Sequence, residues 1–292
     1  MTRRAAHILL LLAAALALSA CAALTRLAYS NVTLAYSNLV PMASWMVDDY
    51  VELSGVQKDW VRERFNRVMQ WHRTQELPEY RRFLQRVLQE SEEPFTVAEI
   101  ASAYADLRVH YHRTIEQLIP DVADFFLQLD AEQVAHLERK FADDNRKFVR
   151  ESVKGTPEER RERRVKRLVQ HLEGWVGPLS EEQEALVDAR HHAVSDLIDE
   201  RLADRRFRQM EILNLIRSRP GKERMMAGLR RLLIDTESWR RPEYQEKLKE
   251  REMRMFEMFS ALSTTLTREQ RSHLQERIRR YMRDISTLSA AG

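Results

Sequence analysis

Apolar side chains recur three and four residues apart along most of the chain, which is the spacing of one face of an α-helix. No alternating run of β-branched residues is long enough to predict a sheet. We therefore expect an all-α protein. The pattern predicts helices over 42–52, 54–73, 77–91, 96–128 (kinked at Pro120), 130–153, 157–174, 180–218, 221–237, 242–264 and 267–288.

The connections between these helices look short, so neighbouring helices should pack as antiparallel hairpins in a multi-helix bundle. The clearest interruptions are Gly155 and the stretch Gly174–Pro178. The bundle is expected either as one body or as two helical subdomains with a boundary near residues 155–178. The chain has only 7 glycines and 8 prolines in 292 residues, a composition that favours helix.

One five-residue pattern, a leucine and then a capping residue with glutamine last, appears four times. The copies are Leu53–Gln57, Leu129–Gln133, Leu179–Gln183 and Leu266–Gln270. Ser, Asp or Thr followed three residues later by Gln is a capping box, in which the two residues satisfy free backbone N–H groups at a helix start. Each copy therefore predicts the first turn of a helix. Thr96 with Glu99, and Thr156 with Glu159, form two further boxes.

The likeness between the four copies extends into the helices that they start. Four and eight residues after each glutamine lie apolar or aromatic side chains on one helix face, and a basic residue follows at the seventh position. These are Val61, Leu137, Val187 and Leu274; Phe65, Phe141, His191 and Ile278; and Arg64, Lys140, Arg190 and Arg277. The copies predict repeated helix-start modules, although their unequal spacings do not give a clean duplication.

The N-terminus has the order of a secretory signal: Arg3 and Arg4, an apolar run from Ile8 to Leu18, and small residues after it. The run has about 11 residues, too few for a helix to span a bilayer. Leu18-Ser19-Ala20-Cys21 resembles a bacterial lipobox, in which cleavage precedes the cysteine and its thiol and new amine are acylated. Ala22 follows, which in the enterobacterial sorting pattern favours the outer membrane.

This resemblance implies a signal peptide at 1–20, a lipidated tether at 21–40 and a periplasmic helical domain at 41–292. The anchor should be stable, because several acyl chains exceed the marginal binding of one chain. Cys21 is the only cysteine, so the mature chain can form no disulfide of its own.

Charge and motifs narrow the function classes. Removing 1–20 removes two of the 48 basic residues and none of the 45 acidic ones, so the net charge falls from +3 to +1. This balance speaks against a nucleic-acid partner. The sequence has no His-Glu-x-x-His motif, no Gly-x-Ser-x-Gly elbow and no glycine-rich phosphate loop. We expect no enzyme, no catalytic residues, no metal site and no cofactor, and interpret His191 as a core-edge residue.

The sharpest charge feature is the run Glu158–Arg167, which alternates acidic and basic residues. Glu158 with Arg161, Glu159 with Arg163 and Glu162 with Lys166 have the spacing of ion pairs along a helix. The run is read either as a solvated, ion-paired face or as a contact for anionic lipid or cell-wall material.

Two family resemblances follow. The four boxes resemble the helix starts of small periplasmic stress chaperones known for an LTxxQ motif, although only Leu266–Gln270 matches it literally. The segment with Trp71-His72-Arg73, Glu76-Leu77-Pro78 and Tyr80 resembles an uncharacterised family of proteobacterial helical lipoproteins. Trp239-Arg240-Arg241-Pro242-Glu243-Tyr244 partly repeats this element.

These resemblances imply an outer-membrane lipoprotein whose helical domain binds envelope polypeptides as a chaperone or adaptor. The alternative is a passive structural or lipid-contacting lipoprotein. Because Trp, Tyr and Arg dominate binding hot spots, the candidate binding residues are Trp71, His72, Arg73, Glu76 and Tyr80. The alternative for Trp71 and Tyr80 is that they hold two helices together.

Overall fold

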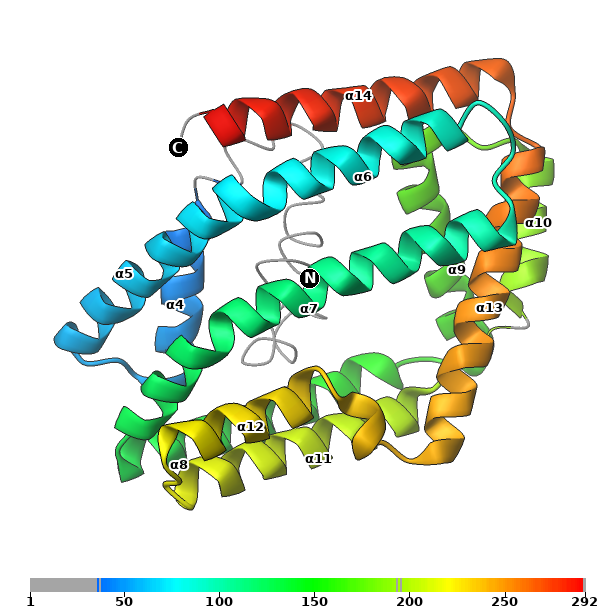
Figure 1. Cartoon of the computed structure of the whole chain (residues 1–292). Coiled ribbons are helices and arrows are strands. Elements are labelled where there is room, and N and C mark those ends of the chain that lie inside the picture. Colours follow the sequence, from blue (N-terminus) through cyan, green and yellow to red (C-terminus); the bar gives the residue numbers. More distant parts are fainter. Residues whose placement is uncertain (1–35, 37, 193, 195, 291–292) are drawn as a thin grey trace. The chain divides into compact units, whose positions relative to one another are not determined.

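The computed structural model describes residue 36, residues 38–192, residue 194 and residues 196–290. The described residues form helices and connecting loops and contain no strand, which confirms the all-α class (Figure 1). The predicted signal peptide, Cys21 and the predicted tether up to residue 35 lie outside the described residues. The α-helices are α4 (Leu39–Val51), α5 (Gly55–Trp71), α6 (Leu77–Glu90), α7 (Val97–Gln128), α8 (Ala131–Ser152), α9 (Pro157–Val176), α10 (Glu181–His192), α11 (Ile198–Arg217), α12 (Lys222–Leu233), α13 (Pro242–Thr264) and α14 (Arg268–Ala290).

Most predicted helices agree with these bounds within a few residues, but the single helix predicted over 180–218 is wrong. The chain instead forms α10 and α11, and Leu197 between them has a positive φ of 54°. The sequence offers neither Gly nor Pro at this break. A second difference is a π-helix over His72–Glu76, which joins α5 to α6. The helix predicted over 221–237 ends at Leu233, and a short 3-10 turn follows at Thr236–Ser238.

The chain divides into two compact units, each made of three separate segments. Unit 1 consists of the residues up to His72, Val109–Ser152 and Ile198–Arg241, and unit 2 of Arg73–Arg108, Val153–Leu197 and Pro242–Gly292. The break between α10 and α11 is one of the places where the chain passes from one unit to the other. The two related Trp and Pro-Glu-Tyr elements span two of the three passages from unit 1 to unit 2.

Unit 1 contains α4, α5, the C-terminal part of α7, α8, α11 and α12. Helix α4 packs on α5 and α8, and α11 packs on α8 and α12 (Figure 1). Its interior is closed by fully buried apolar side chains, which supply most of the driving force for folding. They include Ile115, Ile119, Leu129, Leu137, Ile212, Met225 and Leu229.

A buried ionic cluster crosses the interior of unit 1. The Tyr50 hydroxyl donates a short hydrogen bond to the Asp144 carboxylate, and the guanidinium of Arg205 lies 4.0 Å from that carboxylate. Burial, followed by the bond to Asp144, raises the pKa of Tyr50 above its ordinary value. Burial likewise lowers the pKa of Arg205. The ring of Phe148 lies 5.6 Å from the Arg205 guanidinium.

Unit 2 contains α6, the N-terminal part of α7, α9, α10, α13 and α14. Helix α6 runs along α14, while α9 contacts both α10 and α14 (Figure 1). Gly177 ends α9 with a φ of 85°, a left-handed conformation that favours glycine. Val169, Val187, Met258 and Leu262 form the core cluster where α9, α10 and α13 meet.

All four leucine–glutamine boxes start helices, as predicted. In each box the glutamine Oε1 accepts from the backbone N–H of the capping residue, at 3.0–3.2 Å. The predicted inward faces are also confirmed. Of the eight residues four and eight places after the glutamines, all are buried except Leu274, which is half-buried.

The boxes meet in pairs, which the sequence did not indicate. In unit 2 the amides of Gln183 and Gln270 exchange two hydrogen bonds, each 2.8 Å long. In unit 1 Gln57 and Gln133 exchange bonds of 3.2 and 2.7 Å. In each unit, the starts of two helices are therefore joined through their glutamines.

Candidate functional site: an apolar pocket in unit 1

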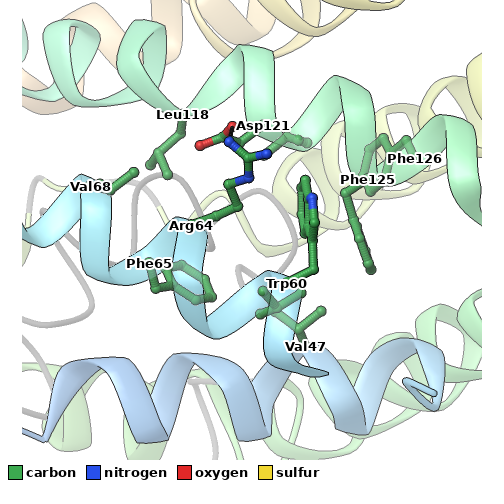
Figure 2. A pocket seen from close by; sticks show the side chains of 11 residues that line it. Val47, Trp60, Arg64, Phe65, Val68, Leu118, Asp121, Phe125 and Phe126 are labelled. Carbon is green, nitrogen blue, oxygen red and sulfur yellow. Dashed lines mark ion pairs between the residues drawn. The ribbon is translucent and has the colours of Figure 1, made fainter. Parts of the chain in front are cut away.

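An apolar pocket lies in unit 1, where α4, α5 and α7 approach one another (Figure 2). Its lining is almost entirely aliphatic and aromatic, which is the usual character of a binding site. Eleven residues line it: Val47 from α4; Trp60, Val61, Arg64, Phe65 and Val68 from α5; and Leu118, Asp121, Val122, Phe125 and Phe126 from α7.

The polar groups of the pocket are an ion pair that joins α5 to α7. The guanidinium of Arg64 lies 3.6 Å from the Asp121 carboxylate, which also pairs with Arg67 at 3.2 Å. Figure 2 shows Arg64 and Asp121 facing each other beside Trp60. Burial raises the pKa of Asp121, and the charge of Arg67 opposes this shift.

Trp60 forms an aromatic wall of the pocket. Its ring stacks on Phe125 with centroids 6.0 Å apart and an interplanar angle of 19°. The guanidinium of Arg64 lies 4.9 Å from the Trp60 centroid, within the range of a cation–π contact. Trp60 and Arg64 are only partly buried, so both remain accessible to a partner.

The size of the pocket limits what it can hold. Its volume is about 50 Å³. Pockets for cofactors and drug-sized ligands have about 300–1,000 Å³, so this one is too small for them. Since one water needs roughly 10–15 Å³ by this measure, the space suits about four heavy atoms, the size of a leucine side chain.

Unit 2 fills the corresponding place with its own side chains. Val61 in the pocket and Val187 in the core cluster both lie four residues after the glutamine of a box. Around Val187, the helices α9, α10 and α13 close with Val169, Met258 and Leu262, and Met258 is fully buried. The position that lines the pocket in unit 1 thus lies within a buried core cluster in unit 2.

The five candidate residues predicted from the sequence do not form one exposed patch. His72 and Glu76 are buried, with 7% and 0% of their surface exposed. Trp71, Arg73 and Tyr80 are half-buried. Trp71 lines a shallow surface hollow that it shares with His112, Arg113 and Glu116.

His72 is part of a buried contact within unit 1. Its Nδ1 lies 3.1 Å from the hydroxyl of Tyr36, which donates to the Met69 carbonyl at 3.3 Å. Burial, together with the nearby His110, lowers the pKa of His72 to about 4. His72 is therefore neutral at physiological pH. It connects Tyr36, which lies shortly before α4, to the end of α5.

The basic run on α9 is engaged with a neighbouring segment of unit 2. Arg161 pairs with Asp188, while Arg164 and Arg160 lie 2.9 and 3.8 Å from Asp196. Three of its cations thus face carboxylates beyond α9, rather than the acidic residues of their own helix. This arrangement favours the ion-paired interpretation over an open basic stripe.

Among the described residues, no three or more His, Cys, Asp or Glu side chains are grouped so that they could hold a metal ion. No helix in the described part of the chain combines the length and apolar character needed to cross a membrane.

The prediction from the sequence did not include Trp60, Asp121 and Phe125 among the site residues. Arg64 was noted only as the basic residue seven places after Gln57. Asp121 follows Pro120 inside a long, mostly apolar helix. Its charge on an inward face was the one feature of the sequence that could have indicated the site. Nothing local linked it to α5.

The fold and site together define a two-unit, all-α helical protein with a small apolar pocket. The chain belongs to a family of unknown function, DUF6279, whose profile matches residues 49–245. Comparison with curated proteins and with solved structures finds no match.

Proposed function

We propose that this protein is a bacterial outer-membrane lipoprotein, acylated at Cys21, whose helical domain faces the periplasm and binds envelope polypeptides as a chaperone or adaptor. The observation that carries the binding role is the pocket between α4, α5 and α7. Its volume suits one aliphatic side chain of a polypeptide rather than a cofactor. The anchoring role is supported by the sequence Leu18–Cys21 at the end of a signal-like segment.

The chemistry of the pocket supports a polypeptide partner. An apolar side chain entering it would contact Trp60 and Phe125, and Trp is enriched among residues that dominate binding energy. Arg64 and Asp121 at its edge offer a donor and an acceptor for the partner's backbone. An apolar anchor beside a few polar groups is the usual arrangement of a specific binding site.

The alternative of a lipid- or cell-wall-contacting role through the Arg160–Arg167 run has less support. Arg160, Arg161 and Arg164 already face Asp188 and Asp196, so their charge is largely compensated. Binding of anionic vesicles that weakens with salt, and that is lost when Arg163 and Arg167 are changed to Gln, would favour this alternative.

The test is photo-crosslinking in living cells with a photoreactive phenylalanine in place of Trp60. The matched control carries the same residue in place of Met210, which is 49% exposed on α11 of the same unit. Val122→Phe should place a ring inside the pocket and reduce the crosslinks, whereas Val122→Ala should preserve them. Melting temperatures check that both variants fold.

A single dominant protein crosslinked from position 60, and not from 210, would indicate an adaptor. A broad set of envelope polypeptides would indicate a chaperone. Crosslinks to lipid alone, or protein crosslinks that are equal at both positions and unaffected by Val122→Phe, would overturn the binding role of the pocket.

A further inference from the structure

Helix α4 has an exposed apolar face at its N-terminal end. Its buried residues Leu39, Ala43, Val47 and Tyr50 form one stripe at helical spacing. The opposite side carries Pro41, Met42 and Trp45, all exposed, and Trp45 is 66% exposed. Trp45 thus leaves most of its surface in water, although burying an aromatic side chain is strongly favourable.

This face lies in a stretch without charge. Between Arg26 and Asp48 the sequence contains no Asp, Glu, Lys, Arg or His. The first acidic residue on the exposed side of the described helix is Asp49, one turn beyond Trp45, and it pairs with Lys140 at 2.7 Å. Asp48 pairs likewise with Lys58 at 2.9 Å. The two acidic residues of α4 nearest Trp45 are thus both paired, so neither adds the cost of moving an unpaired charge out of water.

The proposed anchor is close enough in sequence to bring this face to a bilayer. Asn38, which precedes α4, is 17 residues after Cys21. Such a length reaches at most about 60 Å, since a fully extended chain spans roughly 3.3–3.6 Å per residue. The first turns of α4 are thus the described helical residues nearest in the chain to the lipid.

We infer that Pro41, Met42 and Trp45 dock on the membrane surface that holds the acylated Cys21. The occupant of this face is the lipid interface rather than a protein, because tryptophan is enriched at the boundary between headgroups and acyl chains. Helices that lie in this boundary have an apolar face without charge. The inference rests on the proposed lipid anchor and adds a second, non-covalent contact, which would orient unit 1 at the membrane.

The experiment uses the full mature chain purified from membranes and reconstituted into phosphatidylethanolamine–phosphatidylglycerol vesicles. Half of the vesicles carry bromine atoms in the upper acyl chains, which quench tryptophan fluorescence at close range. The difference between wild type and Trp45→Phe isolates the signal of Trp45. The control is the difference for Trp175→Phe, because Trp175 is also partly exposed but stacks on Tyr281 in unit 2, at 5.3 Å.

Since interfacial helices bury about 5–10 Å into the headgroup boundary, we expect bromine to lower the Trp45 signal at least about twofold and to leave that of Trp175 unchanged. A Trp45 signal that is not quenched in acylated protein would overturn the inference. So would a signal that shifts with protein concentration in the absence of lipid, which would indicate a second copy as the occupant.

Mass spectrometry of the same sample separates this inference from the proposed function. If Cys21 is acylated and Trp45 is not quenched, the proposed anchor is supported and the docking of Trp45 on the membrane is excluded. If Cys21 carries no acyl group, the proposed anchor is excluded. Quenching of Trp45 by added vesicles would then support the membrane docking of α4 independently of the anchor.

Discussion

The amide pair of Gln183 and Gln270 should be a main support of unit 2. Both side chains are buried, with 4% and 8% of their surface exposed. We predict that Gln183→Ala and Gln270→Ala each lower the free energy of unfolding strongly. We also predict that the double variant loses much less than the sum of the two single losses.

The magnitude follows from the bonds that Gln270 makes. Its Oε1 accepts from the Thr267 N–H at 3.0 Å and from Gln183 at 2.8 Å, and its Nε2 donates to the Pro178 carbonyl and to Gln183. At about 1 kcal/mol per bond, with incomplete relaxation around the buried groups, Gln270→Ala should cost about 2–4 kcal/mol. Because two bonds are shared, the coupling between the two sites should be about 1–2 kcal/mol.

The assay is a double-mutant cycle measured by urea unfolding and by amide hydrogen exchange. Hydrogen exchange is needed because two units need not unfold in one step, and it reports α10 and α14 separately. The control is Gln128→Ala, at an exposed position at the end of α7, which should change stability by less than about 0.5 kcal/mol. A coupling below about 0.5 kcal/mol would refute the argument that this amide pair joins the starts of α10 and α14.

Three further predictions test other parts of the molecule. Asp144→Ala should cost about 3–5 kcal/mol of unfolding free energy because it leaves Arg205 buried without its carboxylate, and adding Arg205→Met should restore much of the loss; equal instability of the single and double variants in urea would contradict this. The pKa of His72 is lowered to about 4, so the unfolded chain binds its proton first as pH falls. The contribution of neutral His72 to the free energy of unfolding is therefore complete above about pH 6.5, and it falls by up to about 3 kcal/mol as the pH approaches 4. His72→Gln should remove this part of the acid sensitivity, and identical pH profiles of unfolding for the variant and the wild type would contradict the prediction. A chain cut by protease at a site inserted at Gly155 should elute as one complex, since each unit contains segments from both sides of the cut; separation of the fragments without denaturant would show otherwise.

The local features of the fold were predictable because they depend on neighbours in sequence. A capping box is satisfied within four residues, so Ser54 with Gln57 and Thr156 with Glu159 start their helices as the sequence indicated. The inward faces followed from helical spacing in the same way. The break after α10 could not be predicted, because it occurs where the chain changes units and no Gly or Pro marks it.

The candidate site was not predictable, because its residues come from helices far apart in sequence. Arg64 and Asp121 are 57 positions apart, and neither carries a motif. The interpretation of His72 as a surface residue rested on residue type, and residue type does not determine burial. His72 is covered by Tyr36, which lies at the end of the tether segment and outside any predicted helix.

The paired boxes also explain the spacings that argued against a duplication. The paired glutamines are 76 positions apart in unit 1 and 87 in unit 2. Unit 2 contributes 36 of the first interval, as Arg73–Arg108, and unit 1 contributes 44 of the second, as Ile198–Arg241. Within their own units the paired boxes are therefore 40 and 43 positions apart.

The order of helices along the chain repeats accordingly. Up to Ser152, a pair of successive helices with a box in its loop is followed by a pair that belongs to the other unit and then by a second pair with a box, and the same order occurs after Ser152. The middle pairs contribute α6 and α11, which pack on the second box helix of the opposite half, α14 and α8 respectively. Each half of the chain thus completes the unit built by the other. A comparison of the two halves at one fixed offset cannot reveal this relation, because the middle segments differ in length.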